Sequence, residues 1–432
     1  MPAAPAAPAA QQQQQRTVPT LIAAPADLSK APGAAESEDD EDDMFADDFD
    51  DKALQARDEA AAGGVEGLKD AWDDAEGYYN FRVNEVLHGR YEVYSNFGRG
   101  VFSTVLRARD LQAAPGSAFP EVAIKVIRAN EQMRKAAQLE VAIVRKLAGA
   151  DPENRRHCVR LLSHFEHREH VCMVFEPLAL NLREVLKKFG RNIGLNLGAV
   201  RAYAQQLLIA LKHIYNCGVL HADLKPDNVL VNAGHNLLKL ADFGSAMFAG
   251  ENERTPYLAS RFYRAPEVIL GMAYGHPMDM WAMGATLYEL YTGKILFPGG
   301  SNNAMLRLMM ELKGKLPKRM LRAGIFADKH FDLETGEFGA VGEDPVTRDM
   351  VVKMMQNVQQ KDDVAKRIQA GGGTDEASRG SRSFADLLER MLVLDPEKRI
   401  TPAEALRHPF IQGDRPSQVA GNGRAGGAQQ RH

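Results

Sequence analysis

Two short polar motifs contain the side chains in this sequence that could transfer a phosphoryl group. Residues 221–228, with the sequence HADLKPDN, include Asp223, Lys225 and Asn228, and a second motif begins at Asp242. Phosphoryl transfer needs a carboxylate that orients an attacking hydroxyl and accepts its proton, a cation near the transferred group, and oxygen ligands for magnesium. We expect Asp223 to be the carboxylate and Lys225 the cation. Asn228 and Asp242 are the expected magnesium ligands.

A lysine and a glutamate upstream of these motifs have the setting of a buried ion pair. Lys125 lies in the apolar run at residues 122–127, which predicts a buried strand, and Glu140 lies on the next predicted helix. A buried lysine needs a carboxylate partner. We expect Lys125 to bridge nucleotide phosphates while Glu140 holds its ammonium group, and a purely structural ion pair is the alternative. Because both polar motifs follow Lys125 in order, a turn whose polar residues merely satisfy one another is a poor explanation for them.

A glycine-rich turn precedes this lysine, between two predicted strands. It runs from Gly98 to Val105, and Ser103 stands where the usual phosphate-binding fingerprint has its third glycine. Glycines would let the backbone close over a polyphosphate without a side chain in the way. The turn is weak evidence by itself, because a glycine hairpin without a ligand has the same pattern.

The elements that would position these residues fall into two lobes. Strand patterns cover residues 91–127, a helical pattern follows at 139–147, and apolar runs at 159–162 and 171–175 predict further strands. Later segments are mainly helical. We predict an α+β fold with a sheet-rich lobe at 91–178 and a helical lobe at 179–412.

The second lobe contains an insertion at about 295–382. Residues 333–382 have weak periodicity and a Gly371-Gly372-Gly373 run, so we expect part of the insertion to be flexible. A helix is predicted after it, at 383–394.

The acidic residues are concentrated near the N-terminus. Of 57 acidic residues, 11 lie at positions 36–51, so the rest of the chain has a net charge of +7, against −4 for the whole. Residues 1–75 cannot bury enough apolar surface to offset chain entropy, and we predict a disordered arm there. Met44, Phe45 and Phe49 interrupt the acidic residues, so docking on a basic groove is an alternative to a solvated spacer. A lead-in segment at 76–90 and a flexible tail at 413–432 complete the predicted organisation.

Cysteine content and hydropathy exclude two classes of protein. Three cysteines are too few for disulfides to stabilise a chain of 432 residues. No stretch of 18 or more apolar residues is free of charged residues. We therefore expect a soluble protein of a reducing compartment, without a transmembrane helix.

From Tyr91 to Gln412 the motifs resemble those of eukaryotic protein kinases, in the same order. Ala265-Pro266-Glu267 resembles the end of the activation segment, Asp279-Met280-Trp281 the central helix, and Arg399 the buried partner of Glu267. The resemblance implies a bilobal kinase fold, ATP and Mg²⁺ as cofactors, and a hinge with Phe175 as gatekeeper. It also implies a set of residues around ATP: Phe97, Gly98, Arg99, Gly100, Val101, Phe102, Ser103, Val105, Ala123, Lys125, Glu140, Phe175, Glu176, Leu178 and Leu230.

Other residues resemble one group within that family. Residues 255–264 and the insertion are similar to those of the CMGC kinases. Ala222, Ser301-Asn302-Asn303 and residues 74–79 resemble the spliceosomal pre-mRNA-processing factor four kinases. That likeness implies a nuclear kinase that phosphorylates Ser and Thr of tri-snRNP splicing factors and meets RNA only indirectly. We also expect a monomer that binds no membrane. The alternatives are a catalytically silent scaffold, disfavoured because Lys125, Asp223 and Asp242 are all present, and a dual-specificity or Cdc-like kinase.

The activation lip predicts how the enzyme would be regulated. Most kinases have an arginine at position 222 that clamps a phosphate on the activation loop, and Ala222 cannot do so. We predict that phosphate on Thr255 has little effect, whereas phosphate on Tyr257 is held by Arg261 and Arg264. The resemblance also places Ser260 on the substrate-binding lip, within hydrogen-bonding reach of Asp223 and Lys225.

Overall fold

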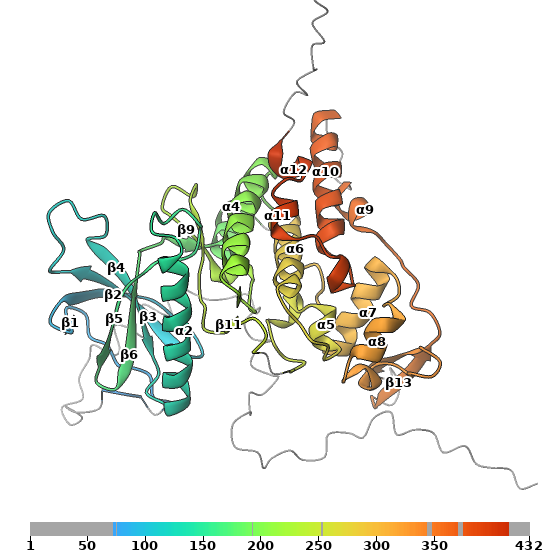
Figure 1. Cartoon of the computed structure of the whole chain (residues 1–432), viewed down its shortest axis with the longest axis horizontal. Helices are drawn as coiled ribbons and strands as arrows, with labels where there is room; N and C mark the ends of the chain where they lie inside the picture. The colour runs from blue at the N-terminus through green and yellow to red at the C-terminus, as the bar shows by residue number, and fades with distance from the viewer. Residues whose placement is uncertain are drawn as a thin grey trace, which may run out of the picture. The chain divides into compact units, whose positions relative to one another are not determined.

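A six-stranded antiparallel sheet forms most of the first lobe in the computed structural model of the chain (Figure 1). The structure describes residues 72–74, 76–191, 193–251, 254–343, 348–369 and 375–413. The predicted disordered arm, apart from residues 72–74, and the predicted tail beyond Gly413 lie outside these residues.

The sheet has the strand order β1-β2-β3-β4-β6-β5. Its strands are β1 (Val86–Leu87), β2 (Tyr91–Arg99), β3 (Ser103–Asp110), β4 (Glu121–Ile127), β5 (Leu161–His167) and β6 (His170–Phe175). The strands expected over residues 91–127 are present as β2, β3 and β4. The lead-in segment also contributes to the sheet, because β1 pairs with β2.

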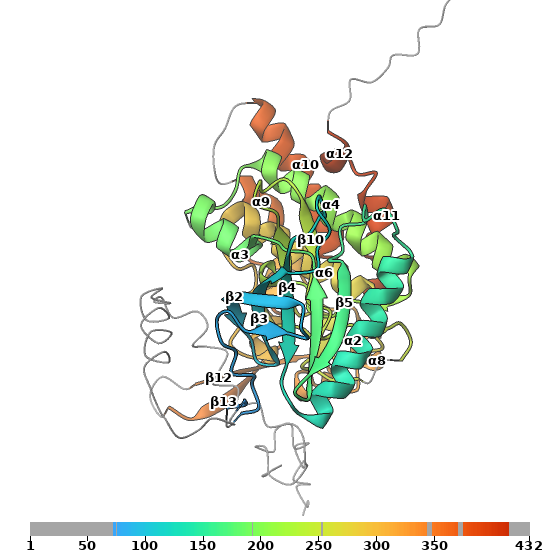
Figure 2. The same ribbon diagram turned by 90° about the vertical axis from the view of Figure 1, so that its left-hand side faces the viewer.

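Helix α2 (Glu131–Gly149) packs against this sheet (Figure 2). It begins after Asn130, whose side chain accepts a hydrogen bond from the backbone N–H of Gln132 and so caps the helix. Ile143, Val144 and Leu147 are buried on one face, at the spacing of an amphipathic helix. Glu140 lies on the same buried side and is 3% exposed, so this helix delivers one carboxylate to the interior.

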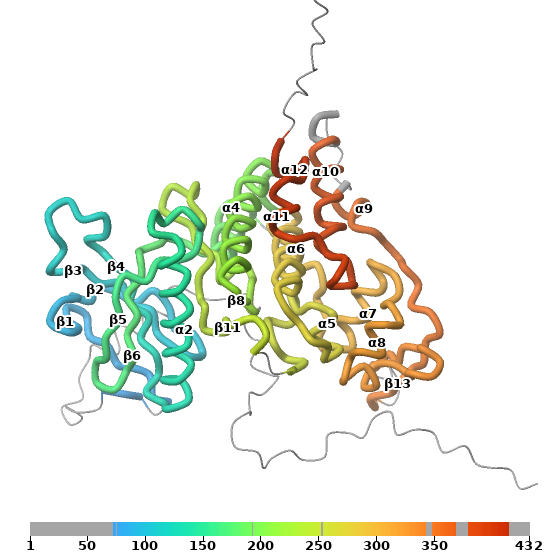
Figure 3. Tube along the Cα trace, in the orientation of Figure 1, coloured from blue at the N-terminus to red at the C-terminus, as the bar shows by residue number. Residues whose placement is uncertain are grey.

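The second lobe is built mainly from helices around α6 (Pro277–Thr292) (Figure 3). Nearly every residue of α6 is buried, which explains its apolar composition all round. The other helices are α3 (Leu182–Val185), α4 (Leu197–Asn216), α5 (Pro266–Ile269), α7 (Asn302–Lys313), α8 (Lys318–Ala323), α9 (Val364–Gln369), α10 (Asp375–Met391), α11 (Pro402–Ala405) and α12 (Pro409–Gln412). Among the described helices, none combines the length and the apolar character needed to cross a membrane.

Short strands line the junction of the lobes. One sheet has the order β10-β9-β7, and a second pairs β11 with β8. Their bounds are β7 (Leu180–Asn181), β8 (Val219–Leu220), β9 (Val229–Val231), β10 (Leu238–Leu240) and β11 (Met247–Phe248). Cys158 of the first lobe forms a parallel bridge with Leu240, so the strand before Asp242 is tied to both lobes.

The insertion is more regular than its weak periodicity suggested. Strands β12 (Phe338–Glu343) and β13 (Met350–Met355) form an antiparallel hairpin, and α9 follows it. Residues 350–354 are exposed, so this strand lacks the alternation of buried and exposed residues that marks a strand in sequence. Gly371-Gly372-Gly373 lie outside the described residues.

The helix predicted at 383–394 is α10, with different limits. It runs from Asp375 to Met391 and so begins eight residues before the predicted start. Residues 375–383 contain no large apolar residue, so the sequence marks only the later part of the helix. The chain leaves the helix before Asp395 and Pro396, because Pro396 begins a separate 3-10 turn.

Candidate active site

Lys125 connects three elements through its ammonium group. Its Nζ donates hydrogen bonds to Glu140 Oε1 and Oε2 at 2.9 and 3.0 Å, and to Asp242 Oδ1 at 2.8 Å. Strand β4, helix α2 and the turn after β10 therefore meet at one cation. An added Cβ at Gly244 would lie 3.2 Å from Asp242 Oδ1 and 3.5 Å from Lys125 Nζ, so the absence of a side chain at Gly244 leaves room for the contact between Lys125 and Asp242.

Within this group, the charges of Lys125 and Asp242 stabilise each other. Burial alone would lower the pKa of Lys125, but the carboxylates of Asp242 and Glu140 more than offset it, and the pKa is raised. The Lys125 ammonium lowers the pKa of Asp242 to about 2. Both groups are therefore charged at neutral pH, and Lys125 is held where it can contact phosphate oxygens.

The catalytic-loop motif forms a second hydrogen-bonded group around Asp223. Asp223 Oδ1 accepts bonds from the backbone N–H and the hydroxyl of Ser260 at 3.0 and 2.7 Å, and Oδ2 accepts one from Asn228 Nδ2 at 3.0 Å. Lys225 Nζ donates to Ser260 Oγ at 2.7 Å and lies 3.4 Å from Asp223 Oδ2. A carboxylate oriented in this way, beside a lysine, can accept the proton of a hydroxyl substrate.

The backbone of this loop is held by Asp279 of α6. The buried Asp279 carboxylate accepts hydrogen bonds from the N–H groups of His221 and Ala222 at 2.9 and 3.0 Å. Ala222 has φ +65° and Asp242 has φ +56°, in the left-handed region, which costs about 1 to 2 kcal/mol for a residue with a Cβ. The surrounding bonds maintain this strained backbone, which aims Asp223 and Asp242.

Asn228 and Asp242 fit a divalent cation. The Asn228 amide hydrogens go to the carbonyl and the carboxylate of Asp223, so its Oδ1 is directed away from Asp223. Asp242 is half exposed and anionic at neutral pH. Amide and carboxylate oxygens are the ligands that hard cations such as Mg²⁺ prefer, and magnesium commonly takes few protein ligands together with phosphates. The bound metal would neutralise phosphate charge.

Several of the residues expected around ATP lie on one face of the six-stranded sheet. Val105 is paired with Lys125, and Ala123 with Phe175, so these side chains project from the same face of the sheet. The apolar residues of the predicted ATP set that are neither buried nor fully exposed, and so leave apolar surface for a ligand, are Phe97, Val105, Ala123, Leu178 and Leu230. Gly98, Arg99 and Gly100 end β2 and begin the turn, Val101 and Phe102 lie exposed at its tip, and Ser103 begins β3.

The hinge contains an ion pair that sequence reasoning missed. The Glu176 side chain accepts hydrogen bonds from Arg160 N at 2.9 Å and Asn154 Nδ2 at 3.3 Å, and Lys239 Nζ lies 3.1 Å from Glu176 Oε1. Lys239 is 1% exposed and also donates to Asn154 Oδ1. A lysine in the middle of the apolar run 238–241 was the available signal, since buried lysines require partners.

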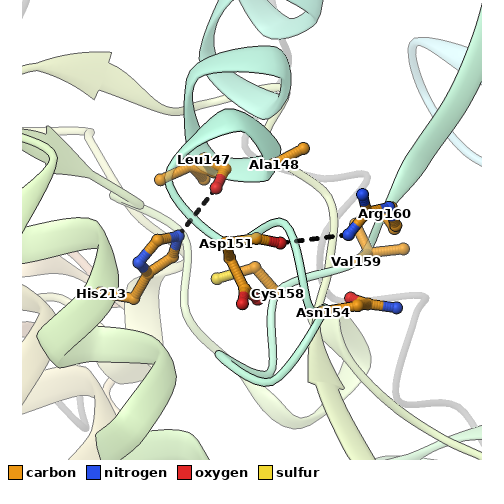
Figure 4. Close-up of a pocket in the computed structure, with 8 residues that line it drawn as sticks. All are labelled: Leu147, Ala148, Asp151, Asn154, Cys158, Val159, Arg160 and His213. Carbon is orange, nitrogen blue, oxygen red and sulfur yellow. Dashed lines mark hydrogen bonds between the residues drawn. The ribbon is translucent and has the colours of Figure 1, made fainter.

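A small pocket lies next to this ion pair (Figure 4). It is lined by Leu147, Ala148, Asp151, Asn154, Cys158, Val159, Arg160 and His213. His213 Nε2 donates to the Leu147 carbonyl at 3.0 Å, and Arg160 Nη1 donates to the Asp151 carbonyl at 3.1 Å. The first of these bonds joins the end of α2 to α4, so the pocket lies where the two lobes meet.

The activation lip surrounds Arg264. Its guanidinium donates to the carbonyls of Tyr257, Leu258 and Ala259 and to Asn302 Oδ1. Tyr257 is 66% exposed and accessible to modification, whereas Thr255 accepts a hydrogen bond from the Tyr257 N–H. Arg261 donates to the carbonyl of Gly300. A phosphate on Tyr257 would therefore compete with backbone carbonyls for both arginines, and Asn302 is a partner that sequence reasoning missed.

Two further ion-pair groups lie next to the activation lip, within the second lobe. Arg399 makes a bidentate contact with Glu267, at 2.6 and 3.0 Å, and both side chains are buried. Glu289 of α6 accepts hydrogen bonds from the Tyr263 hydroxyl and from Arg183, which also contacts Asp227 of the catalytic loop. Glu289 therefore supports both the activation lip, through Tyr263, and the catalytic loop, through Arg183.

The comparisons with known proteins agree with this arrangement. The family model for the protein kinase domain matches residues 91–411. The chain belongs to the protein kinase family, and the predicted bilobal α+β fold and family are both confirmed.

Similarity to individual relatives shows which class of protein kinase this chain belongs to. The chain is 46% identical over 394 residues to serine/threonine-protein kinase prp4 of Schizosaccharomyces pombe, covering 89% of this chain and 81% of that protein. It is 42% identical to serine/threonine-protein kinase prpf4B of Dictyostelium discoideum and 35% identical to dual specificity tyrosine-phosphorylation-regulated kinase 3 of Mus musculus. The alignments cover 80% and 81% of this chain, but only 42% and 58% of those two relatives. The protein is a serine/threonine protein kinase of the CMGC group, and the family uses ATP and a divalent metal ion.

Proposed function

We propose that this kinase transfers the γ-phosphoryl group of ATP, with Mg²⁺ as the metal, to Ser and Thr hydroxyls of pre-mRNA splicing factors in the nucleus. The observation that carries the substrate class is the 46% identity to the kinase prp4 over most of both chains. The motifs at Ala222 and at residues 301–303 support the same branch.

The site supports a direct transfer. Asp223 orients the hydroxyl and accepts its proton, and Lys225 lies beside it to stabilise negative charge that develops on the transferred group. Lys125, fixed by Glu140, contacts the phosphates from the other lobe. Asn228 and Asp242 would hold the metal, which would neutralise phosphate charge.

The test is transfer of radiolabel from ATP to purified tri-snRNP proteins, with wild type beside Asp223→Asn and magnesium present. We expect wild type to label a small set of these proteins on Ser and Thr, and Asp223→Asn to lose the labelling while still binding ATP. Labelling of a general substrate such as myelin basic protein without tri-snRNP labelling would overturn the splicing assignment and favour another CMGC branch. If wild type binds ATP and labels nothing, itself included, the protein would be a scaffold.

A further inference from the structure

A segment outside the family match is packed onto the first lobe. We call residues 72–81, of which 75 lies outside the described residues, the strap. Tyr79 of the strap is 5% exposed and belongs to the core of the sheet. The Asp73 carboxylate lies 2.8 Å from His170 Nε2, and the other ring nitrogen of His170 bonds to the carbonyl of Ile127. These contacts fix the strap to the sheet.

From this anchored position the strap reaches the tip of the glycine-rich turn. The Tyr78 hydroxyl lies 2.7 Å from the carbonyl oxygen of Val101 and 3.0 Å from that of Gly100, and donates its hydrogen between them. Tyr78 is 7% exposed, so water does not compete freely for these bonds. The backbone that would close over the phosphates is therefore held by a residue outside the turn.

Two arginines extend the contact. The Arg99 guanidinium lies 3.7 Å from the centre of the Tyr78 ring and pairs with Asp74 at 2.8 Å and Glu76 at 3.0 Å. Arg128 lies 4.5 Å from the same ring centre, donates to the carbonyl of Val101 and makes two bonds to the carbonyl of Glu76. The strap and the turn therefore share a network of cation–π contacts, ion pairs and hydrogen bonds.

The turn needs such support because its glycines are not packed. Among the described residues, an added Cβ at Gly98 would meet no atom within 4 Å, and one at Gly100 would meet only the Ser103 carbonyl, at 3.8 Å. Unpacked glycines give the backbone freedom that must be lost when it orders over a ligand. A restraint in place before binding lowers that loss.

We propose that the strap is a positioning element of the nucleotide site, in which Tyr78 holds the tip of the glycine-rich turn in its phosphate-binding position. The hydroxyl acts through the Gly100 and Val101 carbonyls and touches no reacting atom. This inference rests on the kinase site and is independent of the splicing substrates.

The test uses the full-length chain with Tyr78→Phe and, as a matched control, Tyr79→Phe. Both substitutions remove one buried hydroxyl from adjacent strap residues, but Tyr79 donates to Glu85 at 2.6 Å and not to the turn. Calorimetry gives the Kd for MgATP and for adenosine, which lacks phosphates, and thermal unfolding gives Tm. Steady-state kinetics give KM for ATP and kcat.

Tyr78→Phe is expected to weaken MgATP binding and raise KM about three- to tenfold. Adenosine affinity and kcat should stay within twofold of wild type. Tyr79→Phe is expected to lower Tm and leave the MgATP affinity unchanged. Asp74→Asn, which weakens the pair with Arg99, should shift MgATP affinity in the same direction as Tyr78→Phe.

Three results would overturn the proposal. They are unchanged MgATP affinity in Tyr78→Phe and Asp74→Asn, an equal loss of adenosine affinity, and an equal MgATP effect in Tyr79→Phe. Because the readout is nucleotide binding, a kinase that fails to label splicing factors but shows the MgATP-specific shift would refute the proposed function and leave the role of the strap standing.

Discussion

Lys239 and Glu176 form a buried ion pair, with 3.1 Å between Nζ and Oε1, that joins the strand leading to Asp242 to the hinge that contacts adenine in protein kinases. The pair therefore fixes the position of each of these two segments relative to the other. Asn154 bonds to both partners, so the loop after α2 takes part as well.

Lys239→Met should therefore destabilise the protein strongly. The substitution leaves the Glu176 carboxylate buried without its cation, and breaking one side of a buried pair costs about 3 to 5 kcal/mol. Urea denaturation measures the loss in free energy of unfolding. The double variant Lys239→Met/Glu176→Gln should recover most of it, since no uncompensated charge remains. A double variant as unstable as the single one would show that Lys239 acts through packing.

Asp223→Asn should abolish turnover without abolishing nucleotide binding. A general base contributes about 10²- to 10⁴-fold to the rate, and the amide cannot accept the proton. Initial-rate assays give kcat, and calorimetry gives the Kd for MgATP. Ser260→Ala serves as the control, because it removes one hydrogen bond from Asp223 and keeps the carboxylate, so its loss of kcat should be smaller. Equal loss of ATP affinity in Asp223→Asn would make Asp223 a structural residue.

The Lys125–Asp242 contact should contribute a constant stability from about pH 4 to about pH 10. The pKa of Asp242 is lowered to about 2 from 3.8, so its stabilisation is complete above pH 4 and is lost as the pH falls towards 2. The pKa of Lys125 is raised, so its contribution is complete below its ordinary value of 10.5 and is lost only in stronger base.

Asp242→Asn tests this relationship. The difference in unfolding free energy between wild type and variant should be largest near neutral pH and shrink between pH 4 and pH 2.5. A difference that stays the same over this range would mean that the carboxylate does not stabilise the fold through its charge.

Tyr257→Phe should reduce activity more than Thr255→Ala. Ala222 offers no side chain to bind a phosphate on Thr255, whereas Arg264 lies 5.8 Å from the Tyr257 ring centre. A charge-assisted contact between phosphate and arginine is worth about tenfold or more in activity if it orders the lip. Initial rates on one peptide substrate, with phosphorylation of Tyr257 followed by mass spectrometry, provide the comparison. The reverse order of the two variants would disprove the assignment.

The grouping of the candidate catalytic residues could be predicted from sequence, because each belongs to a short motif whose residue types suit one chemical role. Asp223 and Asn228 are five residues apart, and Lys125 in an apolar strand demanded a partner on the following helix. The Asn228–Asp223 and Lys125–Glu140 contacts depend on local spacing and on one pairing of strand with helix. The contact of Lys125 with Asp242 spans 117 positions and follows only from the order of the family's motifs.

Other contacts depend on segments that are distant in sequence. Lys239 meets Asn154 across 85 positions, and Arg264 meets Asn302 across 38. Tyr78 could be recognised only as part of a family motif, because its contact with Val101 joins a lead-in segment to a turn 23 positions away. The exposed strand β13 has no buried face, so no period marks it. Tertiary packing, which a single sequence does not display, determines all four.

Helix α6 carries two carboxylates ten residues apart, Asp279 and Glu289, and this spacing corresponds to about 15 Å along the helix axis. Asp279 binds the backbone N–H groups of His221 and Ala222, and Glu289 binds Tyr263 of the substrate lip. Hydrogen exchange at those two N–H groups requires that the buried helix separate from the loop. We therefore expect the amides next to Asp223 to be among the slowest to exchange, although they lie in a loop.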